Sequence, residues 1–190
     1  MVDYKMNQQE IDYNLTQEKI LVKFYNTLFL LYDLAKKLRF ERSVLDEMNT
    51  QLELIACDTK KFAKDQKLER VPHGYTSPDG KTIILDEGYF NQVLNDFPQL
   101  KEYGDDVLQI LFDVCYQFWM DHEFLHSYLI LSGKAKKIWE KYGKEKYRKK
   151  MESATTTLQK KLTAHRTKLY RDEKTKKIWH FWLKRMSSKG

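Results

Sequence analysis

The sequence predicts a mainly α-helical domain of the α+β class, with one small β-sheet or hairpin around residues 70–86. The 190 residues include only seven Gly and three Pro, too few for the many turns of a sandwich or barrel. Hydrophobic residues make up 42% of the chain and aromatic residues 14%, so the chain can bury a core instead of remaining disordered. We therefore expect a single domain over residues 1–190.

The first helix is predicted over residues 16–40, with Thr16 as its N-cap. Apolar residues recur every three or four positions and predict one buried stripe, at positions 20, 21, 24, 28, 31, 34, 35 and 38. A second helix is predicted from Ser43 to about Ala63, because Asp46 follows the capping serine by three residues. Its inward residues would be Val44, Met48, Leu52, Ile55 and Phe62.

A strand-like segment follows these helices. Residues 77–80 read Ser-Pro-Asp-Gly, which predicts a type I turn with proline at its second position. The segment Thr82–Leu85 is short and β-branched, so we expect a strand that pairs with Arg70–Tyr75 in a hairpin or small sheet. Residues 87–100 are expected to form a short helix or turn that ends near Pro98.

A long helix is predicted from Asp105 onward. Asp105 and Asp106 lie in its first turn, where carboxylates interact favourably with the helix dipole. An apolar stripe continues along one face through Val107, Leu111, Val114, Phe118, Leu125 and Leu129. His122 lies on the same face, in the seven-residue interval between Phe118 and Leu125, and His126 lies one turn further on.

The C-terminal third of the chain is strongly basic. Residues 134–190 carry a net charge of +15 and residues 1–133 a net charge of −8, which together give the +7 of the whole chain. The basic third is expected to form two or three amphipathic helices. The difference in charge predicts either an acidic partner for the basic third or an acidic surface within the same molecule.

The sequence favours a cytoplasmic protein. No apolar run approaches the roughly 20 residues that span a bilayer, so we expect no membrane segment. The first residues lack the basic and then apolar pattern of a secretion signal. Cys57 and Cys115 lie far apart and neither belongs to a CxxC pair, so we expect buried thiols rather than a disulfide framework or a cysteine-type zinc site.

The most informative motif is HEFLH, which runs from His122 to His126 inside the predicted long helix. Residues four apart project from one face of a helix, so both imidazoles can reach the same ion, and neutral imidazole is a good zinc ligand. Glu123 lies roughly 100° around the helix from His122, where it could take a proton from water beside the metal. The composition predicts only about 0.01 such motifs by chance. We interpret the motif as a zinc site; the two alternatives are a structural coincidence and a site that has lost its metal function.

A catalytic zinc site usually takes three protein ligands. The extended pattern HExxHxxGxxH is absent, because Leu129 and Ser132 stand at its glycine and third histidine positions. The alternative is a glutamate on a later helix, and Glu152, 26 residues after the second histidine, is the preferred candidate. Glu140 and Glu145 compete with it, but they lie in a lysine-rich stretch that we expect to be solvated.

This order of features resembles the small gluzincin-type zinc metallopeptidases of bacteria and phages, of the Lit-like or ImmA/IrrE-like groups. The features are a strand-like segment, a linking helix, a helix bearing HExxH and a helix bearing Glu152-Ser-Ala, and they cover residues 70–165. The resemblance implies that His122, His126 and Glu152 are zinc ligands and that Glu123 is the general base.

The same resemblance implies a division of the chain into N-terminal helices (1–68), a zincin-like core (69–165) and a basic C-terminal helix (166–190). The strand before the HExxH helix would be the edge along which a peptide substrate lies. We expect a zinc-dependent peptidase of narrow specificity that acts on a protein or peptide. Candidate donors to the oxyanion are His165 and Tyr142, whereas His73 and His180 are expected on loops or the surface.

Two other kinds of function stay open. The protein could be a catalytically inactive zincin-like chain, or a basic helical protein that binds a protein partner or nucleic acid as a phage or plasmid inhibitory factor. Aromatic residues lie among lysines in residues 134–190, and such a surface can stack bases while lysines hold phosphates. The candidate polyanion contacts are Lys136, Lys137, Lys149, Lys150, Lys160 and Lys161.

Overall fold

The structure, a computed structural model, describes residues 13–187 and confirms a mainly helical fold with a small sheet. Its helices are α1 (Gln17–Leu38), α2 (Arg42–Gln51), α3 (Thr59–Asp65), α4 (Tyr89–Asp96), α5 (Asp105–Leu131), α6 (Lys134–Leu169) and α7 (Glu173–Ser187). Its strands are β1 (Glu53–Cys57), β2 (Gly74–Thr76) and β3 (Thr82–Asp86), and a short 3-10 helix, η1 (Pro98–Glu102), follows α4.

Helix α1 forms where it was predicted. The Thr16 hydroxyl accepts a hydrogen bond from the Lys19 N–H (3.3 Å), which satisfies one of the donors left free in the first turn. Arg39 ends the helix in a left-handed conformation. Leu21, which the periodicity placed on the buried stripe, is 40% exposed. The rest of the predicted stripe is largely buried, including Ile20, Phe24, Leu28, Leu31 and Ala35.

The predicted helix from Ser43 to Ala63 is wrong in its second half. Helix α2 ends at Gln51, and the segment Glu53–Cys57 forms β1, which pairs in parallel with β3. Helix α3 then begins after Asp58, whose carboxylate accepts hydrogen bonds from two backbone N–H groups of the first turn. A short apolar run fits a buried helix and a buried strand equally well, and here the pairing with β3 decides between them.

The predicted hairpin forms between β2 and β3. The Gly80 N–H donates to the Ser77 carbonyl (2.9 Å), which closes the predicted turn. The two strands are antiparallel, with Tyr75 opposite Ile84, and the strand order of the sheet is β1-β3-β2. Strand β3 is therefore the central strand, and β2 is an edge strand.

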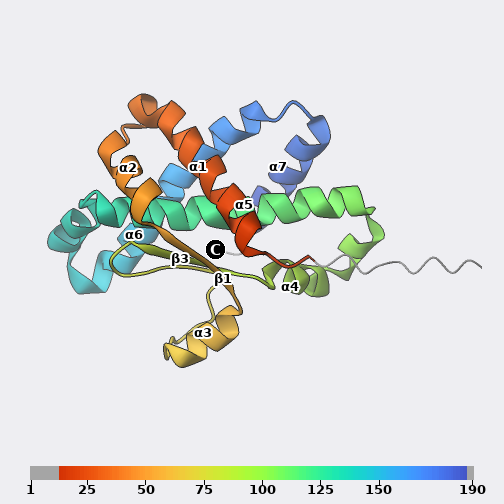
Figure 1. Cartoon of the computed structure of the whole chain (residues 1–190), viewed down its shortest axis with the longest axis horizontal. Helices are drawn as coiled ribbons and strands as arrows, with labels where there is room; N and C mark the ends of the chain where they lie inside the picture. Colours follow the sequence, from red (N-terminus) through yellow and green to blue (C-terminus); the bar gives the residue numbers. More distant parts are fainter. Residues whose placement is uncertain (1–12, 188–190) are drawn as a thin grey trace, which may run out of the picture.

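Helix α5 runs through the middle of the molecule (Figure 1). Helices α1, α2 and α7 lie on one side of it and the sheet on the other, and α5 contacts all of them except β1 closely. The predicted apolar stripe is only part of its buried surface, because most residues from Leu111 to Leu129 are buried, on several faces of the helix, including Phe112, Cys115, Tyr116, Phe124 and Tyr128. A helix buried on several faces is the central element of a core.

Helix α6 follows α5 after a short connection and packs back along it. The backbone at Gly143 has φ 68° and ψ 175°, so α6 consists of two helical parts joined by a kink. With α7, the basic third of the chain therefore forms three helical parts, in agreement with the sequence. Only the part after the kink carries residues that reach the HExxH histidines.

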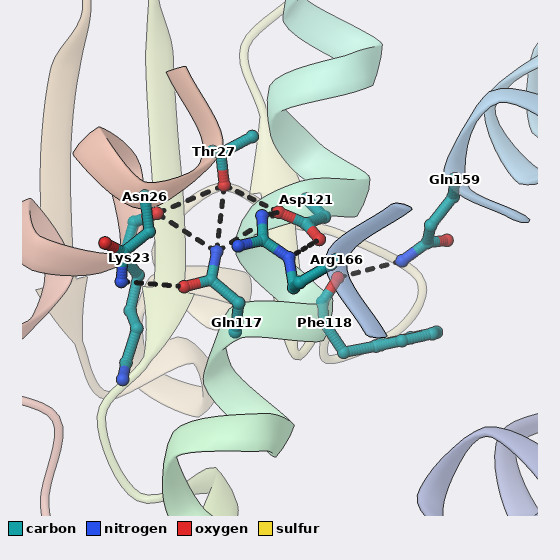
Figure 2. Close-up of polar contacts among 8 residues, drawn as sticks. All are labelled: Lys23, Asn26, Thr27, Gln117, Phe118, Asp121, Gln159 and Arg166. Atoms are coloured by element: carbon teal, nitrogen blue, oxygen red, sulfur yellow. Dashed lines mark hydrogen bonds and ion pairs between the residues drawn. The ribbon is translucent and has the colours of Figure 1, made fainter. Parts of the chain in front are cut away.

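A buried cluster, which we call the polar brace, joins α1, α5 and α6 (Figure 2). It comprises Thr27, Gln117, Asp121 and Arg166, all buried. Arg166 donates from Nε and Nη2 to the two carboxylate oxygens of Asp121 (3.0 and 2.6 Å). Thr27 Oγ1 and Gln117 Nε2 donate to Asp121 Oδ1 (2.6 and 3.1 Å). The brace fixes the position of α6 on α5 next to the HExxH motif.

Within residues 13–187, none of the helices combines the length and the hydrophobicity that crossing a bilayer requires. Cys57 and Cys115 are free, and no disulfide joins them. Cys115 is fully buried, and burial raises the pKa of its thiol well above the usual value. The half-buried Cys57 also has a raised pKa, because of burial and the nearby Glu87, Asp86 and Asp58 carboxylates.

Candidate metal centre

Two histidines of α5 and one glutamate of α6 direct their ligand atoms to a common position. His122 and His126 lie one turn apart, and their Nε2 atoms are 3.2 Å from each other. Glu152 faces them with Oε2 at 3.5 Å from His122 Nε2 and Oε1 at 3.4 Å from His126 Nε2. Ligand atoms of all three residues lie within 4.8 Å of one another. The structure thus brings Glu152 to the histidine pair, whereas Glu140 and Glu145 stay exposed.

Helix α6 also holds the other nitrogen of each imidazole. His122 Nδ1 is 3.1 Å from Gln159 Oε1, an amide oxygen that only accepts, so Nδ1 carries the proton. Thr155 Oγ1 lies 3.3 Å from His126 Nδ1 and can accept a hydrogen bond from it. With a partner on Nδ1, each Nε2 is directed at Glu152: it donates to the carboxylate while the ring is protonated and offers its lone pair to a metal once the ring is neutral, which is the usual arrangement of histidines that bind metal.

The charged groups at this centre shift one another's pKa. Hydrogen bonds from His122 and His126 hold the pKa of Glu152 well below its usual value. Burial alone would lower the pKa of His122, but the hydrogen bond to Glu152 and the charge of Glu123 outweigh it, so this pKa is raised. Glu152 is therefore ionised at neutral pH, which is the form that binds a metal ion.

The donor set fits a divalent metal ion of the zinc type. Two imidazoles and one carboxylate form the His2Glu set of catalytic zinc sites, and a set of three leaves a coordination position for water or substrate. Magnesium and calcium prefer all-oxygen sites, so two nitrogen donors favour a transition metal or zinc. His122, His126 and Glu152 would hold the ion, and its identity as zinc stays a prediction.

Glu123, the predicted general base, lies beside the histidines and against β2. Thr76 Oγ1 donates a hydrogen bond to Glu123 Oε2 (2.8 Å). A Cβ atom at Gly74 would stand 2.7 Å from Glu123 Oε1, so only glycine lets the strand approach the carboxylate this closely. Glu123 is 5% exposed, and burial raises its pKa, although the charges of His122 and His126 and the bond from Thr76 act in the opposite direction.

The centre opens into a cleft of about 1400 Å³. Its floor is the face of α5 that carries Phe118, Trp119, His122, Glu123, His126 and Ile130. One wall is the segment of residues 68–78, which includes β2, and the other is α6 from Tyr147 to Thr167. The metal centre therefore lies at the bottom of a groove between an edge strand and a helix.

The two predicted oxyanion donors do not reach this cleft. His165 is 13 residues after Glu152, which places it about 220° around α6 from the metal centre. Burial and the neighbouring charges of Lys37 and Lys168 lower its pKa. Tyr142 lies before the kink, beneath the ammonium groups of Lys141 and Lys150 (5.3 and 4.9 Å from its ring centroid). The prediction ignored the phase of α6 and its kink, which decide which side chains face the groove.

Several residues that line the cleft were not assigned to it from the sequence. His73 lies on the loop before β2 and His180 is exposed on α7, in agreement with the expectation of loop or surface positions, and both also line the cleft, with the His73 ring 5.6 Å from that of Trp119. Gln159 is seven residues after Glu152, so helical periodicity places both on one face of α6. That spacing could have identified Gln159 as a site residue from the sequence. The contact of Thr76 with Glu123 depends on the tertiary structure, and no local pattern indicates it.

The six lysines predicted to contact polyanions are all exposed on α6: Lys136, Lys137, Lys149, Lys150, Lys160 and Lys161. Of these, only Lys160 lines the cleft. Lys136 forms an ion pair with Glu140 one turn away (3.9 Å), as expected for a solvated surface. Their exposure is compatible with solvation alone, so polyanion binding stays a prediction.

Comparison of the chain with protein-family models, with curated proteins and with solved structures found no match. The resemblance to gluzincin-type peptidases therefore stays a prediction. What bears on function is the geometry of the metal centre and its cleft.

Proposed function

We propose that the protein is a zinc-dependent peptidase of narrow specificity. The observation that carries this proposal is the convergence of Glu152 on the Nε2 atoms of His122 and His126, beside a buried Glu123. The two Nε2 lone pairs lie 3.2 Å apart and repel each other unless a proton or a cation lies close to both. A divalent cation relieves that repulsion and balances the Glu152 carboxylate as well.

Each residue of the centre has a distinct part in this proposal. Zinc, when bound by His122, His126 and Glu152, supplies Lewis-acid activation of a water molecule and a peptide carbonyl. Glu123 accepts the proton of that water and passes it to the leaving amine. Thr76 donates to Oε2 of this carboxylate and helps to hold its orientation. The raised pKa of Glu123 strengthens it as a base while it remains ionised.

The edge of β2 supports a peptide as the substrate. The Asp86 N–H donates to the His73 carbonyl (3.0 Å), and the Ser77 N–H donates to the Thr82 carbonyl (2.9 Å). Alternate residues of an antiparallel strand direct their N–H and C=O groups to opposite edges, so those of Gly74 point away from β3. An extended peptide can pair with this edge, which borders the cleft next to Glu123.

The proposal is tested by peptidase assays on the zinc-loaded protein and its Glu123→Gln variant. We expect the variant to keep its metal and to lose activity by about 10³-fold or more, because the isosteric amide cannot accept the proton. A Glu145→Gln variant, changed on the exposed surface of α6, serves as the control and should keep full activity. Equal activity of Glu123→Gln and the unchanged protein would overturn the assigned role of Glu123.

We place the protein in the cytoplasm, and the free thiols of Cys57 and Cys115 support a reducing compartment. An inactive zincin-like binder of protein or nucleic acid is the second candidate, and the exposed lysines of α6 favour it. If the unchanged protein and the Glu123→Gln variant both bind zinc and neither cleaves a peptide, the second candidate is favoured.

A further inference from the structure

The groove wall formed by α6 carries charged residues at helical spacing on both sides of the metal centre. Arg148, Glu152, Thr156 and Lys160 follow one another at intervals of four residues, and all four line the cleft. Intervals of four keep side chains on one face of a helix, so these residues form a single row along the groove. The metal ligand Glu152 therefore lies between two cationic side chains of the same row.

The cations of the cleft are not neutralised within the described chain. Arg148 and Lys160, and Arg70 on the opposite wall, are exposed, and none of them forms an ion pair with another residue in the range 13–187. Glu69 is the acidic residue that lines the rim beside Arg70. Glu123 and Glu152 belong to the metal centre itself. The rim thus offers three cations against one anion.

The spacing of these cations matches an extended peptide. Along α6, Arg148 lies about 6 Å before Glu152, and Lys160 lies about 12 Å beyond it, at 1.5 Å per residue. An extended peptide advances about 3.3 Å per residue, so the two cations lie about two and about four residues from the scissile bond, on opposite sides. The floor from Phe118 to Ile130 is about 18 Å long, room for five or six extended residues.

Resting on the proposed peptidase function, we propose that the substrate is an extended peptide with acidic side chains on both sides of the scissile bond. Arg148 and Lys160 recognise one acidic side chain each, and the edge of β2 pairs with the peptide backbone. The row of α6 side chains with Arg148 and Lys160 selects acidic peptide segments over neutral or basic ones, and this selection gives the peptidase its narrow range of substrates.

The test uses two fluorescent peptides of about ten residues that differ only in charge, one with Glu and one with Gln at positions flanking the centre. Binding is measured by anisotropy on zinc-loaded Glu123→Gln protein, which reports recognition whether or not the active enzyme turns over. We expect roughly tenfold tighter binding of the acidic peptide, with loss of roughly three- to fivefold in each of Arg148→Glu and Lys160→Glu. Binding should weaken as salt is raised.

The neighbouring lysines provide matched controls. Lys149→Glu and Lys161→Glu make the same change of charge next to the row, on exposed residues that do not line the cleft, and should leave the preference unchanged. Equal binding of the two peptides would overturn the inference, as would equal effects of Lys160→Glu and Lys161→Glu. A single-stranded oligonucleotide that binds more tightly than the acidic peptide would also overturn it.

The outcomes separate this inference from the proposed function. Selective binding without cleavage of either peptide by the unchanged protein would reject the peptidase and keep the acidic binding groove. Cleavage of both peptides at equal rates would keep the peptidase and reject the acidic specificity.

Discussion

Gln159 links the metal centre to the backbone of the opposite helix. Its amide Nε2 donates to the Phe118 carbonyl (2.9 Å), as Figure 2 shows, and its Oε1 faces His122 Nδ1 (3.1 Å). The first bond fixes which end of the amide faces the ring, and the second fixes the tautomer of His122. Gln159 is therefore a positioning residue, because it acts on the metal through His122.

We predict that Gln159→Ala weakens zinc binding by about 10- to 100-fold, the usual effect of removing a partner of a ligating histidine. The Thr157→Ala variant is the control, since Thr157 is exposed and its hydroxyl donates to the Ser153 carbonyl of its own helix (2.8 Å). Competition against a chromophoric chelator measures both affinities. Unchanged affinity in Gln159→Ala would contradict the positioning role.

Gly74 controls the position of the general base. Alanine here would place its Cβ 2.7 Å from Glu123 Oε1, so the carboxylate or the strand must shift. We predict that Gly74→Ala lowers kcat by roughly tenfold or more while zinc content stays the same, because a small displacement of a catalytic group is costly. At Gly88 the Cβ would meet only Asp86 Oδ1 at 3.9 Å, so Gly88→Ala should behave like the unchanged protein.

Zinc uptake should depend on pH through His122. The pKa of His122 is raised, so its imidazole keeps a proton at pH values where an ordinary histidine has lost it. Zinc must displace this proton, so apparent affinity should fall as pH falls through this pKa and level off above it, with a loss of about tenfold per pH unit on the acidic side. Calorimetric titrations between pH 5 and 8 measure this, and a pH-independent affinity would rule it out.

At the scale of elements, the site depends on how α6 lies against α5. The α6 residues Glu152, Thr155 and Gln159 reach the histidines only if α6 does not shift along the axis of α5. The polar brace supplies that constraint, because Asp121 directly precedes His122 and is held by Arg166 of α6. A buried pair of charges tolerates little displacement, since its hydrogen bonds have no replacement from water.

We predict that Arg166→Met destabilises the protein by about 3–5 kcal/mol, because it leaves the buried Asp121 carboxylate unpaired. Changing Asp121→Asn in the same chain should restore part of the loss. Lys176→Met breaks the exposed Lys176–Glu173 pair instead and should change stability by less than about 0.5 kcal/mol. Urea unfolding measures all three, and a loss of under 1 kcal/mol in Arg166→Met would be contrary to the expected role of the brace.

Local patterns in the sequence were sufficient for part of the fold and of the site. The cap at Thr16, the turn before Gly80 and the long helix from Asp105 all follow from neighbouring residues, and so does the pairing of His122 with His126. Strand β1 could not be predicted, because its assignment depends on pairing with β3. The cleft-facing residues of α6 depend on the kink at Gly143 and on helical phase, so Tyr142 and His165 lie outside the cleft lining while Glu152 faces the histidine pair as expected.

At the scale of the whole molecule, the charge difference between the two parts of the chain is satisfied partly within the fold. Within residues 13–187, three ion pairs join a lysine or arginine of the basic third to a carboxylate of the acidic remainder: Glu41 with Lys134, Asp106 with Lys174 and Asp121 with Arg166. Acidic groups of the same molecule thus neutralise three of its basic residues, whereas an acidic partner stays a prediction. Arg148 and Lys160, the cations of α6 that line the groove, form no ion pair within the described residues.

The measurement that tests the central claim most directly is the metal content of the purified chain beside its His122→Ala variant. The account predicts about one zinc per chain, lost in His122→Ala and kept in His165→Ala, since His165 faces away from the cleft. Elemental analysis after exhaustive dialysis gives the numbers. The metal centre, and the peptidase function that rests on it, would be contradicted if the chain held no zinc after incubation with the metal. Equal zinc in the unchanged chain and in His122→Ala would contradict them as well.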